Sequence, residues 1–281
     1  MAAITDLRPS AIAGTWYPGD PGKLTHSIDQ YLATAQPVKI DGQVMAIIVP
    51  HAGHRYSGMV AAYAYNSIRG FPINNVAVIS PMHHFHPAQL LTTAHDAYVT
   101  PLGAIPVNHD LVEALDQYLS AGGRDGLTPV IADEEHSLEI QLPFLQRIIT
   151  DGFKLVPVMM RDQSPDTARA LANGLAKIMP PHSLLVASSD LSHFYSETDA
   201  RLLDSTILRA IEDFSPENVY LVEAEERGFA CGLGAITAVL WAARELGADK
   251  VAIVNRATSG DVTGDHTSVV GYGSGVVYKS K

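Results

Sequence analysis

Histidines follow three apolar segments of the chain that are typical of buried strands. They are His51 and His54 after residues 44–49, His83, His84 and His86 after residues 75–80, and His193 after residues 183–188. In an open α/β sheet the ligand crevice lies outside the carboxyl ends of the strands, so loops far apart in sequence can converge there. Neutral imidazole is the commonest metal ligand in proteins. The pattern predicts a metal site at one edge of one sheet, although for any single loop a local turn-capping histidine is an equal alternative.

Two further polar residues could join this site. Asp190, three residues before His193, is suited to orient an imidazole or to accept a proton from a substrate, and it could equally cap a helix. His136 lies in the segment Asp-Glu-Glu-His-Ser at 133–137. It could act as an acid or a base in the cleft, or simply complete the helix N-terminus that we expect there.

Cys231 is the single cysteine of the chain and stands just before a predicted helix, next to Gly232. A thiol at a helix N-terminus has a lowered pKa, so we expect Cys231 to be reactive. The alternative is a buried, inert cysteine that packs as a small hydrophobic residue. The Trp16-Tyr17 pair near the N-terminus either packs over the cleft or seals the core.

Strands that alternate with helices must position these residues. Residues 44–49, 75–80, 154–160, 183–188 and 250–254 are continuous apolar runs, which are typical of strands covered on both faces. Helices are predicted after the capping pairs at 20–21, 164–165 and 215–216, around Leu203, Ile207 and Ile211, over 231–246, and over 138–149 with a kink at Pro143. The glycine-interrupted tail 269–278 indicates a strand or a strand pair. We therefore predict one α/β domain over residues 1–281, three layers thick, with a central, largely parallel or mixed sheet flanked by helices.

Composition excludes several classes of protein. The 281 residues carry a formal net charge of −11 without a basic cluster, which argues against nucleic-acid binding. No apolar run approaches a membrane span, and residues 1–10 lack the apolar core of a signal peptide. A single cysteine fits a reducing compartment, so we expect a cytoplasmic protein. The absence of a P-loop, a G-x-G-x-x-G turn, an H-E-x-x-H motif and a G-x-S-x-G elbow disfavours nucleotide enzymes, zincin proteases and α/β-hydrolases.

Six motifs in order resemble the Memo family, whose prokaryotic members are called AmmeMemoRadiSam system protein B. They are residues 13–17, 50–53 with 56–58, 81–84, 135–139 with 142–143, 188–193 and 231–232. The resemblance covers essentially the whole chain, from Ala11 to Tyr278. It implies a fold similar to that of class III extradiol ring-cleaving dioxygenases, which use non-haem Fe(II). By its name alone, the prokaryotic family also suggests a radical SAM protein as a partner.

The resemblance also implies a set of site residues. His51 and His83 take the positions of two metal-binding histidines and Cys231 that of the third ligand, while His136, His193 and Asp190 match residues that line the cleft. His54 stands where the family often has an aromatic residue, and so adds one more potential ligand.

A cysteine as third ligand changes the expected chemistry. In the dioxygenases the third ligand is a carboxylate, whereas a softer thiolate suits Cu(I) as well as iron. We therefore expect an iron- or copper-binding redox protein, a possible oxidoreductase of unknown substrate, in which His193 or His136 acts as acid or base and Asp190 supports the site. The alternative is a non-catalytic protein that holds a metal, a small molecule or a peptide in the same cleft. A zinc-type hydrolase with Asp190 activating water has no support from the resemblance.

Overall fold

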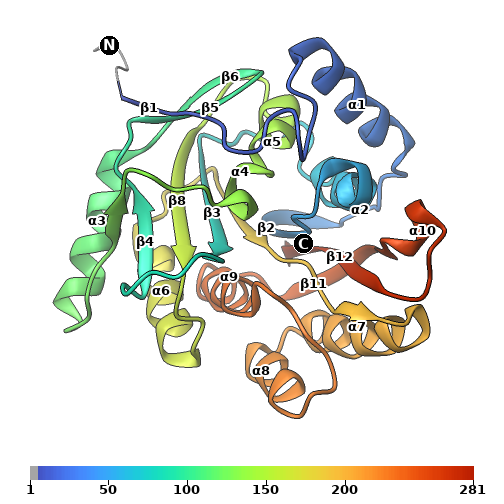
Figure 1. Ribbon diagram of the computed structural model, residues 1–281. Coiled ribbons are helices and arrows are strands. Elements are labelled where there is room, and N and C mark those ends of the chain that lie inside the picture. Colours follow the sequence, from blue (N-terminus) through green and yellow to red (C-terminus); the bar gives the residue numbers. More distant parts are fainter. Residues whose placement is uncertain (1–5) are drawn as a thin grey trace.

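A nine-stranded mixed sheet forms the centre of the structure, a computed structural model that describes residues 6–281 (Figure 1). Its middle consists of four parallel strands in the order β2 (Gly42–Val49), β9 (Ser183–Ser188), β3 (Asn75–Pro81) and β8 (Lys154–Met160). Antiparallel pairing adds β12 (Val269–Ser280), β11 (Lys250–Thr258) and β10 (His193–Tyr195) on one side, and β4 (Leu90–Thr93) on the other, where β7 (Thr128–Val130) is the edge. The largely parallel or mixed sheet predicted from the sequence is confirmed.

The register of the parallel strands brings the histidine-bearing loops to one level. Val49 at the end of β2 lies opposite Ser188 at the end of β9. On the other side of β9, Ile79 of β3 lies opposite Ala187. The segments that follow these three strands therefore leave the sheet side by side.

Helices cover both faces of the sheet, which gives the three predicted layers (Figure 1). One face packs against α3 (His109–Ala121), α6 (Pro165–Ile178), α7 (Glu197–Glu212), α8 (Pro216–Ala224) and α9 (Leu233–Glu245). The other packs against α1 (Pro21–Thr34), α2 (His54–Asn66), α4 (His136–Glu139) and α5 (Leu142–Ile148), and against a small sheet of β1 (Leu7–Arg8), β5 (Ala97–Thr100) and β6 (Gly103–Pro106). The short α10 (Gly260–Thr263) lies in the β11–β12 connection. Each face thus buries its own apolar core.

The predicted helix caps are confirmed, and the predicted kink is a complete break. The side chains of Asp20, Ser164 and Ser215 each accept a hydrogen bond from the backbone N–H three residues later. Pro143 has no N–H to donate to the carbonyl of Glu139, so the helix predicted over 138–149 divides into α4 and α5.

The glycine-rich tail forms one strand, β12, between β11 and β2. A glycine in β12 lets α7 pack close to the strand, because a Cβ at Gly271 would collide with the carboxylate of Asp204 in α7. Within the part of the chain that the structure describes, no helix is long and apolar enough to cross a membrane. Of residues 1–10, for which no signal peptide is expected, the first five lie outside the described part.

Candidate metal centre

Three histidines from different elements form one cluster at the carboxyl edge of the parallel strands. His51 follows β2, His83 follows β3, and His136 opens α4. The ring centroid of His51 lies 5.3 Å from that of His83 and 5.5 Å from that of His136. The rings of His83 and His136 are stacked, with their centroids 4.6 Å apart. One potential ligand atom from each of the three lies within 4.8 Å of the other two.

This spacing fits a metal ion. Two imidazole nitrogens on one ion lie no more than about 4.2 Å apart, which is twice a metal–nitrogen bond of about 2.1 Å. Even the widest pair allowed by the 4.8 Å limit therefore has to close by less than 1 Å, within the reach of small side-chain rotations. The convergence predicted from the strand ends is confirmed for His51 and His83, and His136 joins them.

Burial keeps the imidazoles of the cluster in the form that binds metals. It lowers the pKa of His51 well below the usual range, and the neighbouring His83 and His136 lower it further. Burial also lowers the pKa of His136 to about 4. Both rings are therefore neutral at physiological pH, as metal binding requires.

Cys231 reaches the same cluster from the opposite face of the sheet. Its Sγ lies 3.0 Å from Nε2 of His51 and accepts a hydrogen bond from the backbone N–H of Asp190 at 3.2 Å. The approach depends on Gly232, because a Cβ there would collide with the carbonyl oxygen of Ser188. The sequence correctly placed this cysteine just ahead of α9, whose first residue is Leu233.

The predicted low pKa of Cys231 is wrong. Burial raises the pKa of the thiol well above its usual value, and the nearby carboxylate of Asp190 raises it further. The start of α9 would favour a thiolate. That effect is outweighed by the loss of water around the thiol and by the acidic group beside it.

Asp190 supports the backbone of the cluster rather than a ring. Its Oδ1 accepts hydrogen bonds from the N–H groups of His51 at 2.7 Å and Ala52 at 3.2 Å. Burial raises the pKa of this carboxyl to about 7. The alternative of a helix cap is wrong, because Asp190 is followed by the short strand β10.

His193 stands at the margin of the cluster. Its Nδ1 donates to the carbonyl of Leu191 at 2.8 Å. Burial lowers the pKa of His193, and its proximity contributes to the lowered pKa of His51. The ring is half-buried beside the cluster.

The other histidines of the predicted loops lie outside the cluster. His54 is buried against Phe144, donates from Nε2 to the carbonyl of Ile140 at 3.0 Å, and has its pKa lowered to about 4 by burial. It is a core residue of α2, so the extra ligand suggested by the resemblance is wrong. His86 accepts from the N–H of Ala88 through Nδ1, and His84 lines a surface cavity of about 820 Å³.

Sequence reasoning missed Glu135, which contacts two of the three cluster histidines. Its carboxylate accepts from Nδ1 of His83 at 2.9 Å and lies 3.3 Å from Nδ1 of His136. Burial would raise the pKa of Glu135, yet hydrogen bonds from His83 and from the N–H of Ser137 outweigh it and hold the pKa well below the usual range. The only signal in the sequence is its place next to His136, because nothing local shows that it reaches His83.

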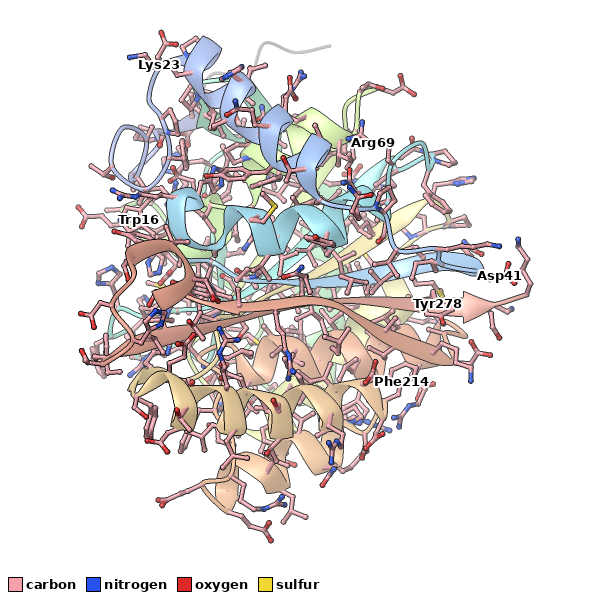
Figure 2. All side chains as sticks on the ribbon, turned by 90° about the vertical axis from the view of Figure 1, so that its right-hand side faces the viewer. Trp16, Lys23, Asp41, Arg69, Phe214 and Tyr278 are labelled. Carbon is pink, nitrogen blue, oxygen red and sulfur yellow. The ribbon has the colours of Figure 1, made fainter. Side chains whose placement is uncertain are left out.

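An aromatic cavity of about 440 Å³ adjoins the cluster. Trp16, Tyr56, Phe194 and Tyr272 contribute its rings. The Trp16 ring also lies 4.3 Å from that of His136, so it links the cavity to the histidines. Figure 2 shows Trp16 at the opposite end of the sheet from Asp41 and Tyr278.

The Trp16-Tyr17 pair fulfils both alternatives considered for it. Trp16 is part of the cavity wall, whereas the ring of Tyr17 is buried and its hydroxyl donates to Glu139 at 2.7 Å.

Fold and site together define a three-layer α/β protein with a cluster of three histidines and a neighbouring thiol at the edge of its sheet. Residues 8–276 match the model of the family described as Memo-like protein, and the chain belongs to this family. A MEMO1 family protein of Nitrosopumilus maritimus is 33% identical over 273 residues, which cover 95% of this chain and 98% of that protein. A MEMO1 family protein of Methanococcoides burtonii is 34% identical over 274 residues, covering 96% of this chain and 100% of that protein.

A solved structure is also similar. It is that of an uncharacterized protein, JW3007, from Escherichia coli K12, with a TM-score of 0.48 and 14% identity, covering 83% of this chain and 100% of that one.

Proposed function

We propose that the protein binds an iron or copper ion through His51, His83 and Cys231, and acts as an oxidoreductase on a small molecule. The observation that carries the proposal is the convergence of three imidazoles and a thiol at one point, with Sγ of Cys231 3.0 Å from Nε2 of His51. Imidazole suits both iron and copper, and a sulfur ligand adds affinity for Cu(I). When bound, such an ion supplies one-electron chemistry that no side chain of the cluster provides.

A second ligand set is favoured by the compactness of the cluster. His136 lies as close to His51 and His83 as they do to each other, within 4.8 Å. Burial also disfavours the thiolate that Cys231 must become as a ligand. In this arrangement three histidines hold the ion and the thiol stays protonated beside it.

The remaining polar groups have roles around a bound molecule. His193 and, where it is not a ligand, His136 are placed to give or accept a proton, and Asp190 holds the backbone of His51. The aromatic cavity beside Trp16 offers room for a small molecule next to the ion. The same features serve a non-catalytic protein that holds a metal, a small molecule or a peptide, which is the competing function.

Two proposals concern the surroundings of the protein. A radical SAM partner rests on the family resemblance alone. A cytoplasmic location rests on the single cysteine, which fits a reducing compartment.

Elemental analysis tests metal binding. The protein is purified anaerobically without chelators or a metal-binding tag, alongside His51→Ala and the control His26→Ala, which removes an exposed histidine of α1. We expect iron or copper near one equivalent in the wild type and the control, and a loss in His51→Ala. Equal metal content in all three would contradict the site.

Oxygen uptake separates the two functions. Metal-loaded protein that consumes O₂ only with an added substrate is an oxidoreductase. Metal-loaded protein that takes up no O₂ with any of a panel of aromatic and thiol reductants is a binding protein.

A further inference from the structure

One buried carboxylate contacts two histidines that come from different loops. Glu135 is 1% exposed. Its Oε1 accepts the Nδ1 hydrogen of His83 at 2.9 Å and lies 3.3 Å from Nδ1 of His136, while its Oε2 accepts the backbone N–H of His83 at 2.7 Å. An ionised carboxylate can only accept, so Nδ1 of His83, which forms the hydrogen bond to Oε1, has to carry the hydrogen.

The third histidine is oriented by a hydroxyl. Ser188 has one hydrogen, which it donates to the carbonyl of Ser137 at 2.6 Å. Its oxygen must then accept from the other two neighbours, the amide of Gln141 at 2.8 Å and Nδ1 of His51 at 3.1 Å. The amide of Gln141 is itself held in orientation, because its Oε1 accepts from the hydroxyl of Tyr65 at 2.8 Å. His51 therefore also carries its hydrogen on Nδ1.

We propose that Glu135 and Ser188 are positioning residues that fix the hydrogens of His83 and His51 at Nδ1, so that the Nε2 lone pairs of these two rings face a bound ion. A neutral imidazole that donates from Nδ1 has its lone pair on Nε2. Partners at the second ring nitrogen fix the tautomer and orientation of metal-binding histidines in general. The inference rests on the proposed metal site, and it assigns the role of choosing the tautomer to residues that do not touch the ion.

Glu135 is itself held rigidly from the N-terminal strand. Its backbone N–H donates to Oδ1 of Asp133 at 3.0 Å, and its carbonyl accepts from Arg8 at 3.0 Å. Arg8 is 1% exposed and forms ion pairs with Asp133 at 2.7 Å and Glu139 at 2.6 Å. These buried contacts hold the backbone of Glu135 in place, so its carboxylate starts from a fixed position beside His83.

An amide cannot replace this carboxylate. Oε1 faces His83 and the N–H of Ser137, and Oε2 faces the backbone N–H of His83. In Glu135→Gln the NH₂ group must therefore face a backbone donor in either orientation. When it occupies the Oε1 position it also meets Nδ1 of His83, which then has to accept and move its hydrogen to Nε2.

The tautomers of the wild-type protein give the first test. Long-range ¹H–¹⁵N correlation spectra of metal-free protein at about pH 8.5 distinguish Nδ1–H from Nε2–H imidazoles. We expect the Nδ1–H form for His51 and His83, assigned with the His51→Ala and His83→Ala variants. An Nε2–H form of either ring in the wild type would overturn the inference without any variant of Glu135.

Metal affinity gives the second test, with Co²⁺ as the probe. We expect Glu135→Gln to weaken Co²⁺ binding by about 10- to 100-fold, which is the usual effect of mutating a residue that hydrogen-bonds to a metal ligand. The matched control is Glu134→Gln, which makes the same change at an exposed neighbour and should bind Co²⁺ like the wild type. Unchanged affinity in Glu135→Gln would overturn the role of Glu135. If Glu135→Gln does not fold, Ser188→Ala replaces it and should weaken binding in the same direction.

The outcomes separate this inference from the proposed function. A wild type that binds no Co²⁺, Fe(II) or Cu(I) refutes the metal site, whatever the tautomers are. A wild type that binds the ion, with an Nε2–H ring in its metal-free form or with full affinity in the variants, refutes only the positioning role.

Discussion

Metal binding should release about one proton per ion at about pH 8.5 if the thiol of Cys231 becomes a ligand. The thiol is protonated at this pH, because burial and the nearby Asp190 raise its pKa well above the usual value. It must lose its proton to coordinate, since the thiolate is the metal-binding form. Cys231→Ser, which keeps a small polar side chain, should release about one proton fewer than the wild type.

The chosen pH removes other sources of protons. His136, with a pKa of about 4, and His51, with a pKa well below its usual range, are already neutral and release none. Asp190, with a pKa of about 7, is only about 3% protonated at about pH 8.5. A contribution shared by both proteins cancels in the comparison with Cys231→Ser, so the difference reports the thiol.

Calorimetry measures this number directly. Co²⁺ is titrated anaerobically into each protein in two buffers of different ionisation enthalpy, and the change in observed heat between buffers gives the protons released. The near-ultraviolet charge-transfer absorption of a cobalt–thiolate bond provides an independent signal in the wild type. Equal proton release in both proteins, without that absorption, would refute Cys231 as a ligand and favour the set of His51, His83 and His136.

Four other outcomes follow from the structure. In the metal-free protein, iodoacetamide should alkylate Cys231 at least about 10-fold more slowly than in the unfolded chain at neutral pH, because its raised pKa leaves little thiolate, and equal rates would contradict the desolvated thiol. Gly232→Ala should lower the free energy of unfolding by about 1–3 kcal/mol in urea melts, because its Cβ would collide with the carbonyl of Ser188. The control is Gly275→Ala, whose Cβ would make only ordinary contacts from 3.4 Å, so its free energy of unfolding should change little. The Fe(II)-loaded protein should not cleave protocatechuate in an oxygen-electrode assay. In the proposed site with Cys231 as ligand, a thiolate would replace the carboxylate of the ring-cleaving dioxygenases and would itself be open to oxidation. Robust cleavage would favour a dioxygenase. Burial raises the pKa of Asp204 to about 6, so the folded state holds this proton more tightly than the unfolded state, and the resulting stabilisation is lost as the pH rises from about 4 to about 6. The free energy of unfolding of Asp204→Asn, measured relative to the wild type, should therefore rise by about 2 kcal/mol between pH 4 and pH 7. A difference that stays constant with pH would contradict this.

The sequence predicted the fold well because the strands and helix starts carry strong local signals. Continuous apolar runs gave the four central strands to within two residues of their bounds, and Asp20, Ser164 and Ser215 begin helices where their capping side chains predict. The small sheet of β1, β5 and β6 was not predicted, since its strands have only two to four residues. In addition, β1 pairs with β5 across about 90 residues, as Leu7 does with Ala97, and no local pattern contains that information.

The candidate site also has a part that could be predicted from the sequence and a part that could not. Histidines at strand ends could be found in the sequence because sheet topology alone brings His51 and His83 together. The distinction between His54, which is a core residue, and His136, which joins the cluster, depends on how α2 and α4 pack. The prediction of a low pKa for the Cys231 thiol was wrong for a related reason. The start of a helix is visible in the sequence, whereas the burial of Cys231 beside Asp190 is not.

The contact between His51 and Cys231 links the metal-free structure to the proposed chemistry. Because Ser188 fixes the hydrogen of His51 on Nδ1, Nε2 must accept, and the group that donates to it at 3.0 Å is the thiol of Cys231. The raised pKa of the thiol agrees with this hydrogen bond, since only the protonated sulfur can donate. In the proposed site, Nε2 of His51 would bind the ion and could no longer accept this S–H hydrogen bond. The thiol would then either lose its proton to the solvent and become a ligand or donate to the carbonyl of Asp190, 3.5 Å from its sulfur. Both ligand sets thus begin from the same metal-free state, and the fate of one proton decides between them.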